Sequence, residues 1–190
     1  VTCTFTHRAF GPRPAASAVA LARQFAPTLR LSAAEHYRPL AAQDYLARAT
    51  LRTGTPPRGA TAQLHPTLFS LPTGLGASYL DVRGAQPYLH AARYRTIEQQ
   101  LEGARDRPTV YWRIARQLST GRLAVEYWFL YLYNDAIDRH EADWEGVTVF
   151  VQDGAPLGVS YSQHQGRSWS AWPAAVPDDH PIVYVAAGSH

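Results

Sequence analysis

The segment Leu123 to Tyr133 limits the possible folds most, because nearly all of its side chains are apolar or aromatic. Only Glu126 interrupts this run, so both faces of the segment need cover. Such a segment is typical of a central strand with a layer on each side. Residues 109–115 alternate in the manner of a half-buried strand, and residues 145–151 place Glu145 and three valines on one face. The chain from residue 109 onward therefore predicts a β-sheet.

Other segments complete the expected fold. Further strands are predicted at 77–82, 157–164 and 182–187, and short connections between strands favour antiparallel pairing. Helical spacing of apolar residues predicts helices at 15–26 and around 41–51, with a brief one at 96–105. Residues 52–90 are rich in Gly, Pro and Thr and are expected as long loops. The expected fold is mainly β: an antiparallel, jelly-roll-like β-sandwich with one to three short helices, mostly N-terminal, in a single domain at 15–190 that follows an extended segment at 1–14.

Composition narrows the possible functions. A net charge of +3 is too small to indicate nucleic-acid binding. No apolar run reaches the length of about 18 residues that a membrane-spanning helix needs. Cys3 is the only cysteine, so no internal disulfide can form. Methionine is absent even from position 1, which indicates a removed N-terminal segment or a fragment, and removal of a secretory signal would fit an extracellular or cell-envelope location.

The segment Asp138 to Glu145 is the strongest candidate for chemistry. It holds His140, Asp143 and Glu145, and alternate positions of an extended chain put Asp143 and Glu145 on one face. Two neighbouring carboxylates repel each other unless a cation, an arginine or a proton relieves them. Imidazole and carboxylate suit Zn²⁺ or Mn²⁺, and carboxylates with water suit Mg²⁺ or Ca²⁺. The alternative is an acidic, solvated loop in which Trp144 anchors the core.

Two more histidines lie beside predicted strands and extend this hypothesis. His164 ends a strand with a small, polar face, and His190 follows Gly188 and Ser189. Together with the first cluster they predict a divalent-cation site formed by His140, Asp143, Glu145, His164 and His190. Each histidine alone also fits a surface position, and Glu35 fits either an additional site carboxylate or a partner for an arginine. Trp144, Trp169 and Trp172 offer stacking surface for a ligand, or packing for the core or loops.

The order of these motifs resembles the vacuolar protein sorting-associated protein 62 family. The resemblance runs from about residue 21 to the end and is most specific within 125–190. Because the family motif usually continues beyond Gly188-Ser-His190, the resemblance implies that the domain extends past residue 190. It is carried by Phe25-Ala-Pro27, Glu35-x-Tyr37-x-Pro39, Tyr133-Asn134, His140-Glu-x-Asp143-Trp144-Glu145, Tyr161-Ser-Gln-His164, His180-Pro-Ile-Val-Tyr184 and Gly188-Ser-His190.

The segment His140 to Glu145 is also similar to the heptapeptide of the necrosis-inducing, plant-toxin-like proteins. That likeness implies a secreted β-sandwich that binds a divalent cation and recognises sphingolipid sugars, with His140, Asp143 and Glu145 in the metal region. The chain departs from the toxin motif at Ile137-Asp138-Arg139, where the toxins have glycine, histidine and arginine.

Two main hypotheses follow for the function. The first is a secreted or envelope-associated metal-dependent hydrolase, in which metal-activated water attacks a phosphoester or glycoside and Glu145 acts as general base. The second is a non-catalytic module in which the cation bridges the protein and a glycan or lipid head group. A third alternative is a scaffold protein of the cell envelope, in which the acidic cluster only holds loops together.

Overall fold

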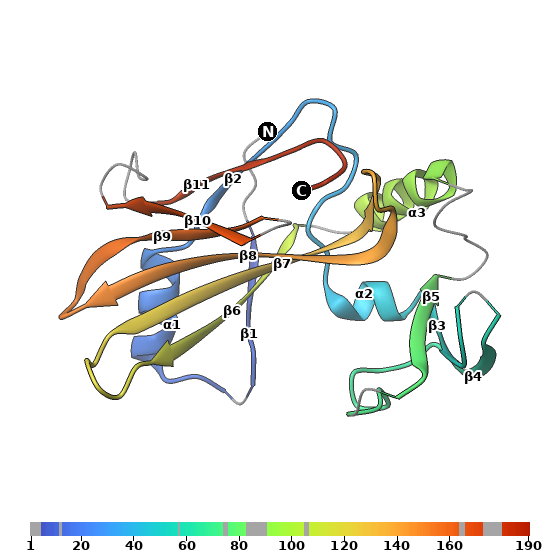
Figure 1. Cartoon of the computed structure of the whole chain (residues 1–190), viewed down its shortest axis with the longest axis horizontal. Coiled ribbons are helices and arrows are strands. Elements are labelled where there is room, and N and C mark those ends of the chain that lie inside the picture. Colours follow the sequence, from blue (N-terminus) through green and yellow to red (C-terminus); the bar gives the residue numbers. More distant parts are fainter. Residues whose placement is uncertain are drawn as a thin grey trace.

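The computed structural model describes residues 5–11, 13–56, 58–73, 76–82, 91–104, 107–163, 166–172 and 180–190. These residues form a mainly β structure with three helices, and the mainly β prediction is confirmed (Figure 1). None of these helices is long and apolar enough to cross a membrane. The elements are β1 (Thr6–Ala9), α1 (Ala16–Gln24), β2 (Thr28–Leu31), α2 (Ala42–Leu46), β3 (Ala49–Thr53), β4 (Ala60–Leu64), β5 (Ser78–Val82), α3 (Ala91–Ala104), β6 (Thr109–Arg116), β7 (Leu123–Asn134), β8 (His140–Gln152), β9 (Ala155–Gln163), β10 (Gly166–Ala171) and β11 (Ile182–Val185).

A six-stranded sheet with the order β1-β6-β7-β8-β9-β10 is the centre of the molecule. We call it the large sheet. The apolar strand β7 lies inside it between β6 and β8, as its sequence predicted. Its odd-numbered side chains from Val125 to Tyr133, among them Tyr127 and Phe129, are 0–1% exposed. Each large apolar side chain buried in this way contributes about 1.5–3 kcal/mol.

Among the described residues, helix α1 and the strand pair β11–β2 cover the face of the large sheet that carries these side chains, here called the inner face. Helix α1 contacts it where the Tyr127 hydroxyl donates a 2.7 Å hydrogen bond to the Ala22 carbonyl. The parallel pair β11–β2 lies beside it and contributes Leu29 and Val185 to the same core. The second layer thus has two strands and a helix, and these pairings do not confirm the jelly-roll part of the prediction.

Two strand pairs are parallel, where the sequence led us to expect antiparallel pairs. β1 pairs with β6, and β2 pairs with β11. The expectation rested on short connections, which favour antiparallel neighbours. Both parallel pairs instead join strands that are far apart in the sequence, so the lengths of the local connections did not constrain them.

The region after residue 41 also differs from the prediction. The expected helix at 41–51 ends at Leu46, and Ala49–Thr53 forms β3. β3 lies between β4 and β5 in a three-stranded sheet. β5 confirms the strand predicted at 77–82, whereas β4 lies in a segment that was expected as a loop. Ala49, Thr50 and Leu51 are buried, and pairing on both sides of β3 outweighs the weak helical pattern. α3 begins at Ala91 and not near residue 96, and β10 was not predicted.

Candidate functional site

A cavity of about 610 Å³ lies between the inner face and the β11–β2 pair. Its wall combines one carboxylate, several hydroxyl groups and aromatic rings. Ligand cavities commonly have this size, with an apolar wall and a few convergent polar groups. The lining includes Leu29, Phe129, Tyr131, Glu145, Tyr161, Ser162, Gln163, Ser168, Ser170, Tyr184, Ser189 and His190.

Glu145 supplies the carboxylate of this cavity. The Ser162 hydroxyl donates to Glu145 Oε2 and accepts a 2.7 Å hydrogen bond from the Gly146 amide. The backbone pairing of β8 with β9 ends at Val147–Tyr161, so the Ser162 side chain satisfies an amide that the sheet leaves without a strand partner. The two strands thereby fix the Glu145 carboxylate at the cavity wall.

His140 and Asp143 form a second group, at the beginning of β8. His140 Nδ1 is 2.8 Å from the Asp138 carbonyl oxygen, which can only accept, so this nitrogen carries a hydrogen. His140 Nε2 is 3.5 Å from Asp143 Oδ1, and the other Asp143 oxygen accepts from Asn134 Nδ2 at 3.2 Å. In the neutral imidazole the Nε2 lone pair faces a carboxylate, and a proton or a metal ion between them relieves that repulsion. The chemistry of this pair therefore suits a cation.

Glu35 and His190 form a third group, which is fully buried. Glu35 accepts hydrogen bonds of 2.6 Å from the amides of Tyr37 and Gly188, and one of its oxygens lies 3.5 Å from His190 Nδ1. Both side chains are 0% exposed. Burial alone would raise the pKa of Glu35, but His190 and the two amides outweigh it and lower that pKa.

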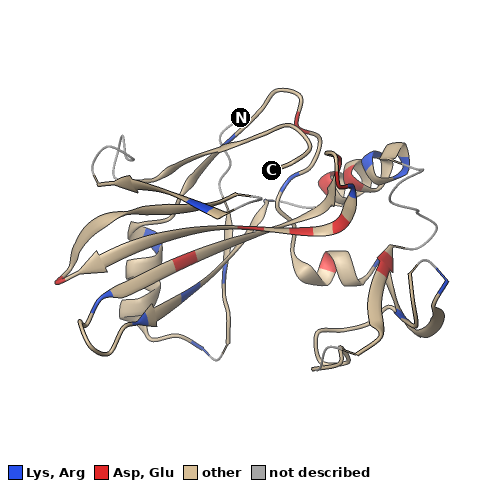
Figure 2. Ribbon diagram, in the orientation of Figure 1, with Lys and Arg blue, Asp and Glu red and all other residues tan. Residues whose placement is uncertain are grey.

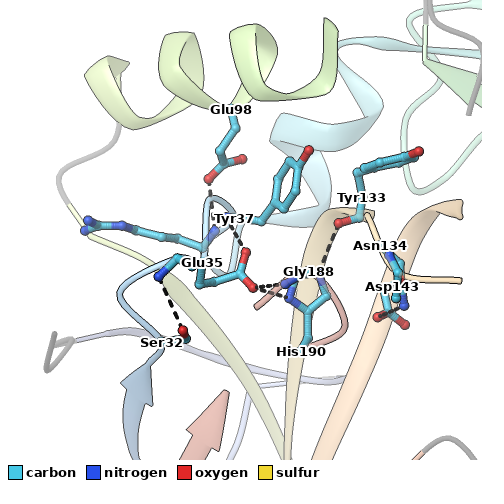
Figure 3. A network of polar contacts seen from close by, with 12 residues as sticks. Ser32, Glu35, Tyr37, Glu98, Tyr133, Asn134, Asp143, Gly188 and His190 are labelled. Atoms are coloured by element: carbon cyan, nitrogen blue, oxygen red, sulfur yellow. Dashed lines mark hydrogen bonds and ion pairs between the residues drawn. The ribbon is translucent and has the colours of Figure 1, made fainter. Parts of the chain in front are cut away.

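The His190 ring is directed at protein partners on several sides. His190 Nε2 lies 3.0 Å from the Tyr133 carbonyl oxygen, and the ring stacks on Tyr131 with 3.8 Å between centroids. Figure 3 shows His190 beside Glu35 and Tyr133 and, as a separate group, Asn134 with Asp143. The structure thus joins His190 to Glu35 and not to His140 or Asp143, and Glu35 has a histidine as its partner where an arginine had been considered.

The remaining predicted residues lie elsewhere. His164 falls outside the described residues. Trp144 and Trp169 are 40% and 56% exposed on the face of the large sheet opposite the cavity, while Trp172 packs edge-on against Phe25. Within the described part of the chain, no three His, Cys, Asp or Glu side chains are grouped to hold a metal ion. Among the described residues, the structure brings two of the predicted metal ligands together, His140 and Asp143.

Glu141 is a partly buried carboxylate that the sequence did not single out. The Tyr94 hydroxyl donates to one of its oxygens, and the Val82 amide donates to the other at 2.9 Å. Burial raises the pKa of Glu141, the nearby Asp81 charge adds to this effect, and the Tyr94 and Val82 hydrogen bonds oppose it. Glu141 thus connects β8 with α3 and β5, in the region where Figure 2 shows acidic residues near α3. Its alternation with Asp143 and Glu145 was the available signal.

Comparisons with solved structures identify the fold. The chain is similar to a protein described under "Toxin fold for microbial attack and plant defense", with 18% identity, a TM-score of 0.51, and 93% of this chain and 65% of that chain covered. A mutant of NLPPya gives 18% identity and a TM-score of 0.53, with 95% and 70% covered. Necrosis and Ethylene inducing Protein 2 from the causal agent of cocoa's Witches Broom disease gives 18% identity and a TM-score of 0.49, with 95% and 69% covered.

The first two similarities establish that the chain has the fold of the NLP toxins. The chain spans 65% of the length of the first of them. The predicted likeness to necrosis-inducing toxin-like proteins is therefore confirmed at the level of the fold. NLPPya is also described in complex with glucosamine and with mannosamine. No family model matches the chain, and no curated protein matches it either, so the resemblance to the vacuolar protein sorting-associated protein 62 family gains no support.

Proposed function

We propose that this chain is a carbohydrate-binding protein of the NLP toxin fold, and that the cavity beside Glu145 takes an amino sugar. The observation that carries the proposal is the composition of the cavity wall, where one carboxylate lies among hydroxyls and aromatic rings. Sugar hydroxyls need many hydrogen-bonding partners, and the C–H faces of sugars pack on aromatic rings. The ammonium group of an amino sugar would form a charge-assisted hydrogen bond with Glu145. The complexes of NLPPya with glucosamine and mannosamine support this ligand class.

Binding without catalysis agrees best with the surroundings of Glu145. A general base needs a free lone pair near its substrate water. The Ser162 hydroxyl donates to one oxygen of Glu145 and fixes the carboxylate at the cavity wall, while the other oxygen can accept from a ligand. Ligand binding is therefore the proposed function, and the metal-dependent hydrolase is the alternative.

A divalent cation remains part of this proposal. Asp143 and His140 would hold it, because their facing lone pairs suit a cation, and His164 and Glu145 are further candidates. Bound there, Ca²⁺, Mg²⁺, Mn²⁺ or Zn²⁺ would supply positive charge for hydroxyl oxygens of the ligand. Secretion or attachment to the cell envelope would fit such a function, as would membership of the vacuolar protein sorting-associated protein 62 family.

Calorimetric titration with glucosamine, mannosamine and glucose tests the proposal. Glu145→Gln should weaken amino-sugar binding about tenfold or more, since a charge-assisted hydrogen bond contributes about 1.5–3 kcal/mol. Asp153→Asn, which neutralises an exposed acid at the β8–β9 turn, should bind as the wild type does. Equal affinity of wild type and Glu145→Gln for glucosamine would contradict the proposal.

The cation is tested separately. Protein stripped with a chelator is titrated with Ca²⁺, Mg²⁺, Mn²⁺ and Zn²⁺, in the wild type and in Asp143→Asn. We expect saturable binding of one of these ions that Asp143→Asn weakens. If the wild type binds none of them, or Asp143→Asn binds equally well, the cation site is wrong while the sugar cavity can still stand.

A further inference from the structure

Exposed aromatic residues gather on the face of the large sheet opposite the cavity, here called the outer face. The strand pairings place Tyr111 beside Trp128, and Trp169 beside Ser160, on this face. Trp144, Trp169 and Phe10 are 40%, 56% and 42% exposed. Exposed large aromatic residues that share one face of a sheet often mark a surface that contacts a partner or ligand.

Two of the tryptophan rings lie over glycines of the sheet, which leave room for them. A Cβ atom at Gly146 would be 3.1–3.4 Å from three atoms of the Trp128 six-membered ring. A Cβ atom at Gly158 would be 2.7 Å from Trp169 Cη2. A larger residue at either glycine would therefore displace the ring above it.

The aromatic rings follow one strand. Residues 144, 146, 148 and 150 of β8 share the outer face; Trp144 is the first, and the Trp128 ring covers the second. Phe150 is the last, and its ring lies 5.6 Å from that of Trp169. At about 3.3 Å per residue, this row is about 20 Å long. Phe10 and Tyr111 extend it, since the Tyr111 ring lies 5.0 Å from Phe10 and 5.6 Å from Trp144.

Polar groups lie between the rings, and the carboxylate among them, Glu126, is paired with Arg113. Arg113 binds both oxygens of Glu126, at 2.7 and 3.3 Å, and Trp128 Nε1 donates to the same carboxylate at 3.3 Å. Arg167 donates to the Thr148 hydroxyl at 3.4 Å. A lipid surface or an apolar protein partner would leave these groups buried without water, which is costly. A neutral ligand rich in hydroxyls would exchange hydrogen bonds with them.

We propose that the outer face binds an extended, neutral polysaccharide of β-1,4-linked sugars. Successive rings of such a chain present flat C–H faces, which pack on flat aromatic rings, and their hydroxyls reach the polar groups between them. The surface is separate from the cavity, because the rings and Glu145 lie on opposite faces of β8. It therefore gives the chain a polymer-binding surface in addition to a site for a single sugar.

Cosedimentation with insoluble chitin and cellulose, followed by titration with the soluble hexasaccharides, tests this inference. We expect retention on at least one polymer. Trp144→Ala and Trp169→Ala should each raise the Kd for the hexasaccharide about two- to tenfold. Gly146→Ala keeps every ring but displaces that of Trp128, and should weaken binding as well. Phe69→Ala removes an aromatic ring that is fully exposed elsewhere, and should change nothing. Circular dichroism melts confirm that each variant is folded.

The outcomes separate the two surfaces. Glu145→Gln should leave polymer retention unchanged, and the tryptophan variants should leave glucosamine binding unchanged. The inference is overturned if the wild type is retained on neither polymer, or if Glu145→Gln abolishes retention and the folded tryptophan variants keep it. It is also overturned if the outer face pairs two copies, seen as a dimer in light scattering that Trp144→Ala converts to a monomer.

Discussion

The contacts of Glu141 can be tested directly by replacing it, because this partly buried carboxylate accepts hydrogen bonds from Tyr94 of α3 and Val82 of β5. Glu141→Ala leaves the Tyr94 hydroxyl and the Val82 amide without their acceptor. Each buried donor left in this way costs about 1–3 kcal/mol, so the free energy of unfolding should fall by about 2–5 kcal/mol at pH 7. Glu141→Gln keeps an oxygen for the Val82 amide and should cost about 1 kcal/mol.

The raised pKa of Glu141 predicts how the stability difference between wild type and Glu141→Gln changes with pH. Burial raises the pKa of Glu141 above its unfolded value, so the folded state binds the proton more tightly. The contribution of this proton is complete below the unfolded pKa and is lost as the pH rises through the folded pKa. The stability of the wild type relative to Glu141→Gln should therefore decrease as the pH rises from about 4 to 7.

Urea denaturation at a series of pH values, followed by tryptophan fluorescence, measures both effects. Equal losses in Glu141→Ala and Glu141→Gln would show that the oxygen and the side-chain packing that Gln retains contribute nothing to stability. A stability difference between wild type and Glu141→Gln that grows with pH would refute the assignment of burial as the dominant effect on Glu141.

Three further predictions concern other described contacts. Glu35→Gln should show the opposite pH trend, because the pKa of Glu35 is lowered. The stabilisation by Glu35 is present above its unfolded pKa of about 4.5 and is lost as the pH falls through the folded pKa. Urea denaturation between pH 3 and 7 measures this change, and a trend of the same sign as that for Glu141 would contradict the prediction. Tyr127→Phe should cost about 1 kcal/mol in a thermal melt, because it leaves the Ala22 carbonyl without its donor; no change would mean that water replaces the hydroxyl. Arg38→Ala should cost less than about 1 kcal/mol in the same melt, because its ion pair with Glu102 is 43% and 36% exposed, and a larger loss would indicate a further role.

The sequence predicted the parts of the fold that depend on local pattern. The apolar run of β7 and the alternation in β6 and β8 were sufficient to identify the centre of the sheet. The parallel pairing of β2 with β11 could not be read in the same way, because no local signal records which distant strand completes a pair. The short strand β3 was not predicted because the spacing of Tyr45, Leu46 and Ala49 also fits a helix. Pairing with β4 and β5 on its two sides makes this segment a strand.

The candidate site was predictable to a similar extent. The sequence led us to group His140 with Asp143, and the structure places His140 Nε2 3.5 Å from Asp143 Oδ1. It could not indicate that Glu35 would meet His190, since those residues come from opposite ends of the chain. The sequence also gave Glu141 no special status, because its burial depends on α3 and β5, whose positions are set by tertiary packing.

The pairing of β2 with β11 has a consequence for how the chain folds. Residues 28–31 leave the ribosome well before their partners at 182–185. Contacts between such distant residues carry a high entropic cost of loop closure and form slowly. During synthesis Leu29 and Leu31 therefore lack their neighbouring strand until residues 182–185 have emerged, and the wall that this pair gives to the cavity beside Glu145 can form only then.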